Sequence, residues 1–296
     1  MRYHIERDCR MRFAAPTREH HVRIRLAPWN DESQSLIRIS LVVDPEVTPV
    51  ARYDGFGNLS HHFAVLDAHR ELAFSLVADV ETRREDPFDF TPVPPARELA
   101  WIADSLRQAP RLWDFVLHQQ EPTPALSADL LGRAVPDFRP GIPILQQVQE
   151  SFAWVQSVAR FDPTLDRSVP ALPALVRAAR GTAADLAHLL IALVRHWRLP
   201  ARFVSGYLDA DYLLPHGTPS TPAASPSGRL HHWVEVLIPG GGWRGFDPAL
   251  GLLADAAYVR VAIGRDAHDI EALRQSCKGN GQPELDETLR VSRLFS

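Results

Sequence analysis

The hydrophobic repeat of this chain changes once, at a proline-rich segment, and that change constrains the fold more than any other feature. Before it, apolar and polar residues alternate at 21–26 and 36–43, as in half-buried strands. Four prolines then fall within 86–97, and proline disfavours helix interiors and central strands. Beyond them, apolar residues recur every three or four positions at 99–106 and 144–158, as on one face of a helix. The switch predicts an antiparallel β domain at 1–85, a linker at 86–97 and a second domain at 98–296.

The second domain is predicted to be α+β, with one core helix packed on an antiparallel sheet. The clearest helix is 183–198, with a leucine-rich face, Gly181-Thr182 before its start and Leu199-Pro200 after its end. Strand-like segments are found at 201–208, 230–238, 243–246, 259–263 and 285–295. The intervening segment 209–229 is rich in Pro, Ser, Thr and Ala, which predicts a surface loop.

Composition and charge exclude several classes of protein. The net charge is -4 without a long block of one sign, so nucleic-acid binding is not expected. No apolar run approaches the roughly 20 residues of a membrane-spanning helix. The first residues lack the apolar core of a secretory signal, which favours a cytoplasmic protein.

Metal and cofactor sites are not predicted either. The two cysteines, Cys9 and Cys277, lie far apart and form neither a CxxC pair nor a disulfide framework, so we expect free thiols. The adjacent histidine pairs at 20–21, 61–62 and 231–232 do not suit a metal, because neighbouring residues on a strand point to opposite faces.

Two strands carry residues that could act together. His231 lies near the start of one strand, and Asp247 ends the next. An aspartate can orient an imidazole so that its second nitrogen accepts a proton from a nucleophile. The pair could equally serve only to hold the two strands together. A thiolate partner would favour a helix N-terminus, where the helix dipole lowers a cysteine pKa.

Residues 180–189, RGTAADLAHL, resemble the motif that opens the core helix of the bacterial transglutaminase-like proteins, whose second domain is a papain-like transglutaminase core. The resemblance continues in LPARFVSGYL at 199–208, HHWVEV at 231–236 and GWRGFDP at 242–248. It extends to the N-terminal part through YHI at 3–5, residues 16–28 and YDGFGN at 53–58, and so covers almost the whole chain.

The resemblance implies cysteine-dependent acyl transfer or peptide hydrolysis, with His231 as base and Asp247 as its partner. Ala183, however, stands where the family has its nucleophilic cysteine, and a methyl group cannot attack a carbonyl. We therefore predict a pseudoenzyme that binds a peptide or protein partner, with Thr182 and Trp233 contributing to binding. The resemblance also implies a peptide-modifying system that contains an ATP-grasp-type ligase.

One alternative keeps the protein active. Thr182 adjoins the vacant nucleophile position, and its hydroxyl could be activated by His231 and Asp247 in an amidase, peptidase or acyl transferase. A threonine at this place would also serve as the N-cap of the helix. Cys9 and Cys277 are not expected near His231, because neither stands at the start of this helix.

Overall fold

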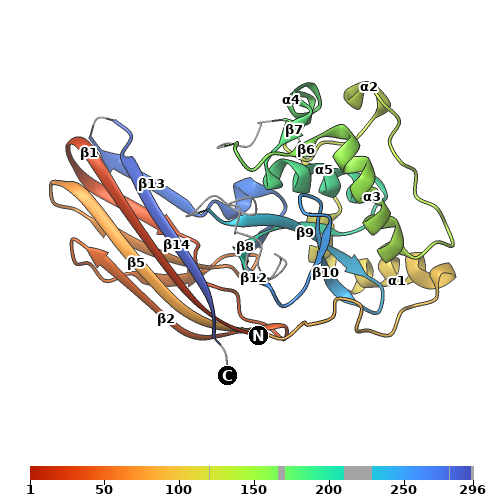
Figure 1. Ribbon diagram of the computed structural model, residues 1–296, viewed down its shortest axis with the longest axis horizontal. Helices are drawn as coiled ribbons and strands as arrows, with labels where there is room; N and C mark the ends of the chain where they lie inside the picture. The colour runs from red at the N-terminus through yellow and green to blue at the C-terminus, as the bar shows by residue number, and fades with distance from the viewer. Residues whose placement is uncertain (120, 166–170, 210–228, 280, 295–296) are drawn as a thin grey trace, which may run out of the picture.

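The computed structural model describes residues 1–119, 121–165, 171–209, 229–279 and 281–294. It has an N-terminal antiparallel sheet beside an α+β unit, which confirms the predicted fold class (Figure 1). The first sheet contains β1 (Arg2–Ile24), β2 (Gln34–Asp44), β3 (Val50–Tyr53), β4 (Leu59–Val65), β5 (His69–Thr82), β13 (Leu273–Lys278) and β14 (Glu284–Leu294).

Strand β1 organises the first sheet, because it is long enough to pair with different partners along its length. Its first half pairs with β5 and β14, and its second half pairs with β4 and β13. A register shift separates the halves, where Glu19 adopts a left-handed φ of 49°. Beyond the shift the inward face passes from odd residues such as Ile5 to even ones such as Val22 and Ile24. The predicted strand at 21–26 is therefore the end of a much longer one.

The C-terminal strands correct the predicted division of the chain. The sequence predicts that 98–296 all belong to the second domain, but β13 and β14 are paired with β1. The first sheet is consequently built from both ends of the chain. The alternation at the C-terminus predicts a strand but not its partner, because pairing depends on contacts between residues nearly the whole chain apart.

The α+β unit has a five-stranded antiparallel sheet in the order β11-β10-β9-β8-β12. Its strands are β8 (Ala201–Leu208), β9 (His231–Ile238), β10 (Gly242–Asp247), β11 (Leu252–Ala254) and β12 (Tyr258–Gly264). A small parallel pair joins β6 (Arg160–Phe161) and β7 (Arg180–Gly181). The helices are α1 (Pro95–Gln108), α2 (Ala128–Leu131), α3 (Ile144–Val158), α4 (Leu172–Ala178) and α5 (Ala183–His196), with 3-10 turns η1 (Pro110–Phe115) and η2 (Ala267–Ile270). None of the described helices is long and apolar enough to cross a lipid bilayer.

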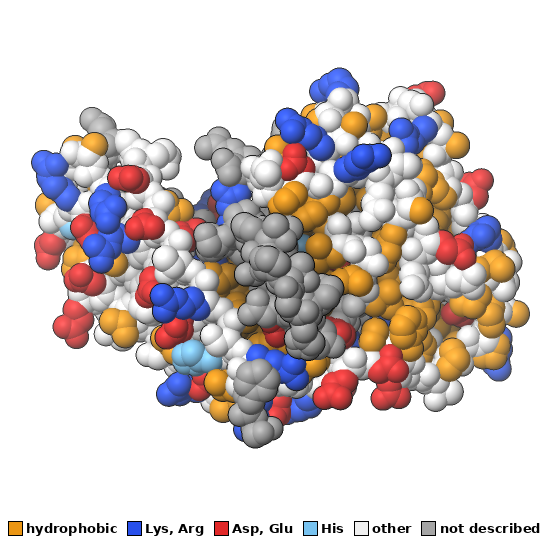
Figure 2. Space-filling model, viewed as in Figure 1, with side chains coloured by type: hydrophobic (Ala, Val, Ile, Leu, Met, Phe, Trp, Pro, Cys, Tyr) orange, Lys and Arg blue, Asp and Glu red, His pale blue; other side chains and the backbone are white. Residues whose placement is uncertain are grey.

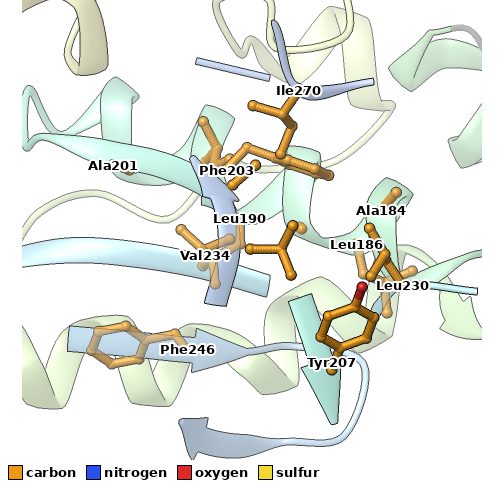
Figure 3. Packing of buried hydrophobic residues seen from close by; sticks show 14 of the residues in the cluster. Ala184, Leu186, Leu190, Ala201, Phe203, Tyr207, Leu230, Val234, Phe246 and Ile270 are labelled. Atoms are coloured by element: carbon orange, nitrogen blue, oxygen red, sulfur yellow. The ribbon is translucent and has the colours of Figure 1, made fainter. Parts of the chain in front are cut away.

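Helix α5 is the core helix that the apolar periodicity predicts. Leu190 packs toward Phe203 of β8 and Val234 of β9, and all three side chains are fully buried (Figure 3). Burial of a leucine side chain contributes about 2 kcal/mol. The helix ends two residues before the predicted position, because Arg198 takes a left-handed φ of 60° ahead of Leu199-Pro200.

Two buried side-chain amides join the N-terminal sheet to the core. Strand β12 lies at the edge of the core sheet, where backbone groups would lack partners. The Gln34 amide pairs with the backbone N–H and C=O of Arg260, at 2.8 and 2.9 Å. The Asn58 amide does the same at Ile263, with both distances 2.8 Å. The two units are thus held in one arrangement by polar contacts as well as by packing.

On the face of the molecule seen in Figure 2, the two units differ in surface character. Figure 2 shows charged side chains of both signs interspersed over the N-terminal sheet, and apolar side chains gathered over the α+β unit. Three of the exposed apolar residues lie in α1, in η1 or just after η1: Leu99, Trp113 and Leu117.

Candidate functional site

The structure brings His231 and Asp247 together. His231 begins β9 and Asp247 ends the neighbouring β10, so the antiparallel pairing places them at one end of the sheet. His231 Nε2 lies 2.6 Å from Asp247 Oδ2, and both side chains are almost completely buried. Because an ionised carboxylate only accepts hydrogen bonds, Nε2 carries the proton and Nδ1 has the free lone pair of a base.

Asp247 is held on both of its oxygens. Oδ2 also accepts a hydrogen bond from the Tyr258 hydroxyl at 3.0 Å, and Oδ1 accepts from the backbone N–H groups of Ala249 and Leu250 at 3.0 and 3.2 Å. Burial, and then the neighbouring Asp247, raise the pKa of Tyr258, which keeps its phenol protonated as a donor. Sequence reasoning missed Tyr258, since no local pattern relates it to a residue on another strand.

A pocket of about 490 Å³ opens beside this pair, between the two units. The start of α5 lines it with Thr182, Ala183 and Ala184, and the sheet lines it with His231. The N-terminal sheet contributes Arg7 of β1 and Glu287 of β14, which form an ion pair of 2.9 Å, among other residues. The predicted nucleophile position therefore shares one cavity with the predicted base, and part of the wall comes from a unit that sequence reasoning did not assign to the site.

Local packing positions the start of α5. Strand β6 pairs in parallel with β7, and this brings the residues after β6 beside the helix N-terminus. Gly181 precedes the helix, and a Cβ there would lie 2.6 Å from Leu175 Cδ1 and 2.9 Å from Asp185 Cβ. Only glycine permits so close an approach without displacement of neighbours.

Thr182 is engaged as the N-cap of α5. Its Oγ1 accepts from the backbone N–H of Asp185 at 3.3 Å and donates to Asp185 Oδ2 at 2.9 Å. Asp185 Oδ2 also accepts from the Thr182 backbone N–H at 2.8 Å, which completes a capping box. The hydroxyl proton of Thr182 is directed to Asp185 in this arrangement. The Asp185 carboxylate therefore competes with any base for that proton.

Trp233, which is predicted to contribute to binding, does not line this pocket. It is 1% exposed and packs behind the histidine, with its ring 6.4 Å from that of His231 and 5.3 Å from that of Tyr258. A Cβ at Gly206 or Gly245 would contact its indole, at 2.5 and 3.3 Å. Gly206 and Gly245 thus leave room for the indole of Trp233, which packs behind His231.

The two other histidines near the site belong to a separate stack. Phe203 lies between His188 and His232, with ring centroids 4.6 and 5.2 Å away. His188 Nε2 accepts a hydrogen bond from the backbone N–H of Ala267 at 3.2 Å. Burial lowers the pKa of His188 well below its ordinary value, and burial with the adjacent His231 lowers the pKa of His232 to about 3. Both side chains are neutral at physiological pH.

The cysteines do not supply a thiol to this pocket. Cys9 is buried in the N-terminal sheet, where burial raises its pKa to about 12, and Cys277 lies on β13. Neither is among the residues that line the cavity. Within the described part of the chain, no group of three or more His, Cys, Asp or Glu side chains is arranged to hold a metal ion.

The α+β unit thus places a buried His–Asp pair in the same pocket as the N-terminus of its core helix. Comparison with known proteins shows the family of this core. Residues 3–81 match the bacterial transglutaminase-like N-terminal region, and residues 138–248 match the transglutaminase-like superfamily. The chain belongs to the transglutaminase-like superfamily and carries the bacterial N-terminal region of that group.

Individual relatives extend the match over most of the chain. An uncharacterized protein of Mycobacterium leprae is 25% identical over 285 residues, which cover 95% of each chain. An uncharacterized protein of Mycobacterium tuberculosis is 25% identical over 280 residues, covering 92% of this chain and 86% of the relative. A crystal structure of a "putative cysteine protease" from Cytophaga hutchinsonii has a TM-score of 0.62 at 18% identity, covering 100% of this chain and 91% of that one, which shows a shared fold.

Proposed function

We propose that this protein is a catalytically inactive member of its family, which binds a peptide or protein segment in the inherited cleft without acyl transfer. The observation that carries the proposal is the methyl group of Ala183, which lines the same pocket as the oriented base His231. The His231 imidazole has a free Nδ1 that could act as a base, but Ala183 offers it no thiol to deprotonate. The remaining donors and acceptors of the cleft can recognise an amide group without reacting with it.

The Arg7–Glu287 pair supports the choice of a peptide as ligand. It gives the cleft a charged wall, while Ala183, Ala184 and Phe203 give it apolar surface. Extended peptides present apolar side chains and polar backbone groups together. A cleft with both kinds of surface suits such a ligand better than it suits a small charged metabolite.

Restoration of the thiol tests the proposal. We expect no turnover by the wild type when a fluorescent primary amine and a glutamine-containing peptide are supplied. Ala183→Cys should produce labelled peptide or hydrolysed amide, and Ala183→Cys/His231→Ala should not. Ala184→Cys is the matched control, because Ala184 lines the same pocket one helical position further on. Its thiol should not support turnover.

A second measurement on the same variants does not depend on the choice of substrate. Alkylation by iodoacetamide reports the thiolate fraction, which a helix N-terminus and a nearby imidazole increase. The Ala183→Cys thiol should react at lower pH than the Ala184→Cys thiol, and the difference should shrink in His231→Ala. Equal reactivity of the two thiols would contradict an inherited catalytic geometry.

Turnover by the wild type would overturn the proposal in favour of the threonine alternative. In that case His231→Ala and Thr182→Ala should each abolish activity, while Thr182→Ser should retain it. The capping box counts against this outcome, because Thr182 donates its hydroxyl proton to Asp185.

We extend the proposal to the partner, an ATP-grasp-type ligase of a peptide-modifying system in the cytoplasm. The family resemblance supports the ligase, and the two free cysteines accord with a reducing compartment. Sedimentation velocity with the purified ligase of the same organism should show a complex. Ala183→Phe, which fills the cleft, should weaken it, whereas the exposed control Arg107→Gln should not. Unchanged binding by Ala183→Phe would contradict a role for the cleft.

A further inference from the structure

A second hollow, on the N-terminal sheet, gathers positive charge. It has a volume of about 660 Å³ and is formed by β1, β3, β4 and β13 together with Thr48. We call it the basic groove and define it by the charged and titratable residues that line it: His21, Arg23, Arg52, His62 and Arg274. No carboxylate side chain is among its lining residues within the described chain. It shares no lining residue with the cleft beside His231.

Strand register places these cations in direct opposition. Arg23 of β1 pairs with Arg274 of β13 on one side and with His62 of β4 on the other. Side chains at paired positions lie on the same face of a sheet, about 5 Å apart at Cβ, and like charges there are destabilising. Burial lowers the pKa of Arg23, and the neighbouring Arg25 and Arg274 lower it further.

No ion pair joins Arg23, Arg52 or Arg274 to a carboxylate among the residues that the structure describes, and Arg23 Nε has no hydrogen-bond partner there. Glu271 and Asp54 raise the pKa of Arg23 through space, against the larger effects of burial and the neighbouring arginines. Asp54 is itself paired with Arg25, at 3.1 Å.

The pKa of His62, one of the two histidines of the basic groove, is shifted by the same positive charges. Burial lowers the pKa of His62, and the three neighbouring arginines Arg23, Arg52 and Arg25 lower it further. His62 Nε2 is paired with the Ser60 hydroxyl at 3.1 Å. The groove therefore holds its positive charge on arginines, which stay protonated at any physiological pH.

We propose that the basic groove binds an acidic segment of a partner protein through its carboxylates. Arginine presents planar pairs of N–H donors that match a carboxylate, and an acidic ligand would relieve the repulsion between Arg23 and Arg274. The net charge of the chain is -4, so a long polyanion such as a nucleic acid would be repelled beyond the groove. A short acidic segment avoids that repulsion. This site is independent of the proposed pseudoenzyme cleft.

Binding of a defined probe tests the proposal. A short fluorescein-labelled peptide of alternating Glu and Gly should bind the wild type with an anisotropy change, and the matched Gln/Gly peptide should not. Arg52→Gln/Arg274→Gln should weaken binding about tenfold, as expected for two lost charge-assisted contacts at an exposed surface. Added salt should weaken the wild-type binding as well.

Matched variants separate the groove from general electrostatics and from the cleft. Arg107→Gln/Arg111→Gln removes the same charge from exposed positions at α1 and η1 and should bind like the wild type. Because the substitutions remove mutual repulsion, the melting temperature of Arg52→Gln/Arg274→Gln should be no lower than that of the wild type. This measurement also checks that the variant is folded. Equal binding by the two double variants would overturn the proposal, as would tighter binding of a single-stranded oligonucleotide of equal charge. Ala183→Cys changes the cleft and leaves the groove intact, because the two share no lining residue. A lack of peptide binding at the groove therefore does not count against the function proposed for the cleft.

Discussion

Replacement of Asp247 by alanine should cost about 4 kcal/mol of unfolding free energy, because the carboxylate satisfies four buried or partly buried donors. The His231 Nε2–H and the Tyr258 hydroxyl would each be left unpaired in a buried place, at about 1–3 kcal/mol apiece. The N–H groups of Ala249 and Leu250 lie nearer the surface and add less. Asp247 itself is fully buried, so water enters the space only at a further cost.

Asp247→Asn is the matched control for this loss. The asparagine oxygen can still accept from the backbone N–H groups of Ala249 and Leu250, and the packing is preserved. Its NH₂ group, however, takes the place of Oδ2 and faces two donors, His231 Nε2–H and the Tyr258 hydroxyl. The Tyr258 hydroxyl can turn to accept, and His231 can exchange its tautomer, so we expect a cost of about 1–2 kcal/mol. Tyr258→Phe removes one hydrogen bond and should cost about 1 kcal/mol.

Urea unfolding followed by far-UV circular dichroism measures these values, with the slope m as a check that the unfolding transition is unchanged. The predicted order of stability is wild type, then Tyr258→Phe, then Asp247→Asn, and last Asp247→Ala. An Asp247→Ala protein within 1 kcal/mol of wild type would refute the reasoning, as its magnitude rests on unsatisfied donors. It would mean that the pair is accessible to water.

Three further outcomes follow from the contacts around the site. Thr182→Ala should destabilise the protein by about 1 kcal/mol in urea unfolding through loss of the capping box, and Thr182→Ser should not. Glu235→Ala leaves the buried Arg202 without its carboxylate at 2.7 Å and should lower stability by about 3 kcal/mol, whereas Glu235→Gln should cost less. Because the folded-state pKa of His232 is depressed to about 3, the unfolded chain binds the proton first, and stability is lost as pH falls below about 6.5. The free energy of unfolding, from urea titrations between pH 6.5 and 4, should therefore fall less steeply in His232→Asn, by up to about 1 kcal/mol per pH unit. An unchanged slope would contradict the depressed pKa, and the exposed control His196→Asn should leave the slope as it is.

Much of the fold could be predicted from local patterns. The helix at 183–198 and the strands at 201–208 and 230–238 agree with α5, β8 and β9 to within two residues. Each has an apolar period that belongs to one backbone conformation, so the prediction needs only neighbouring residues. The long β1 was harder, because Pro16 and charged residues interrupt the alternation and the inward face changes phase near Glu19.

The candidate site was predictable to a smaller degree. The position of His231 near the start of one strand and of Asp247 at the end of the next indicated that the two could act together, and the structure places them 2.6 Å apart. Tyr258, which completes the hydrogen bonding of Asp247, and Arg7, which lines the opposite wall, had no local signal. Trp233 stands in the same motif as His231, and strand alternation places both side chains on one face of the sheet. Gly206 and Gly245 leave room on that face for the indole, which therefore packs behind the histidine.

The sequence by itself determined the helices and strands with the clearest apolar period, such as α5, β8 and β9, and it determined that the residue opening the core helix is a methyl-bearing alanine. These are properties of a residue and its near neighbours, which hydrophobic periodicity and capping chemistry express directly. Only the tertiary structure decided that β13 and β14 return to β1, that the cleft lies between two units, and that Arg23 faces Arg274. Such contacts join residues far apart in the chain, and their register is selected by the packing of the whole sheet rather than by local preference.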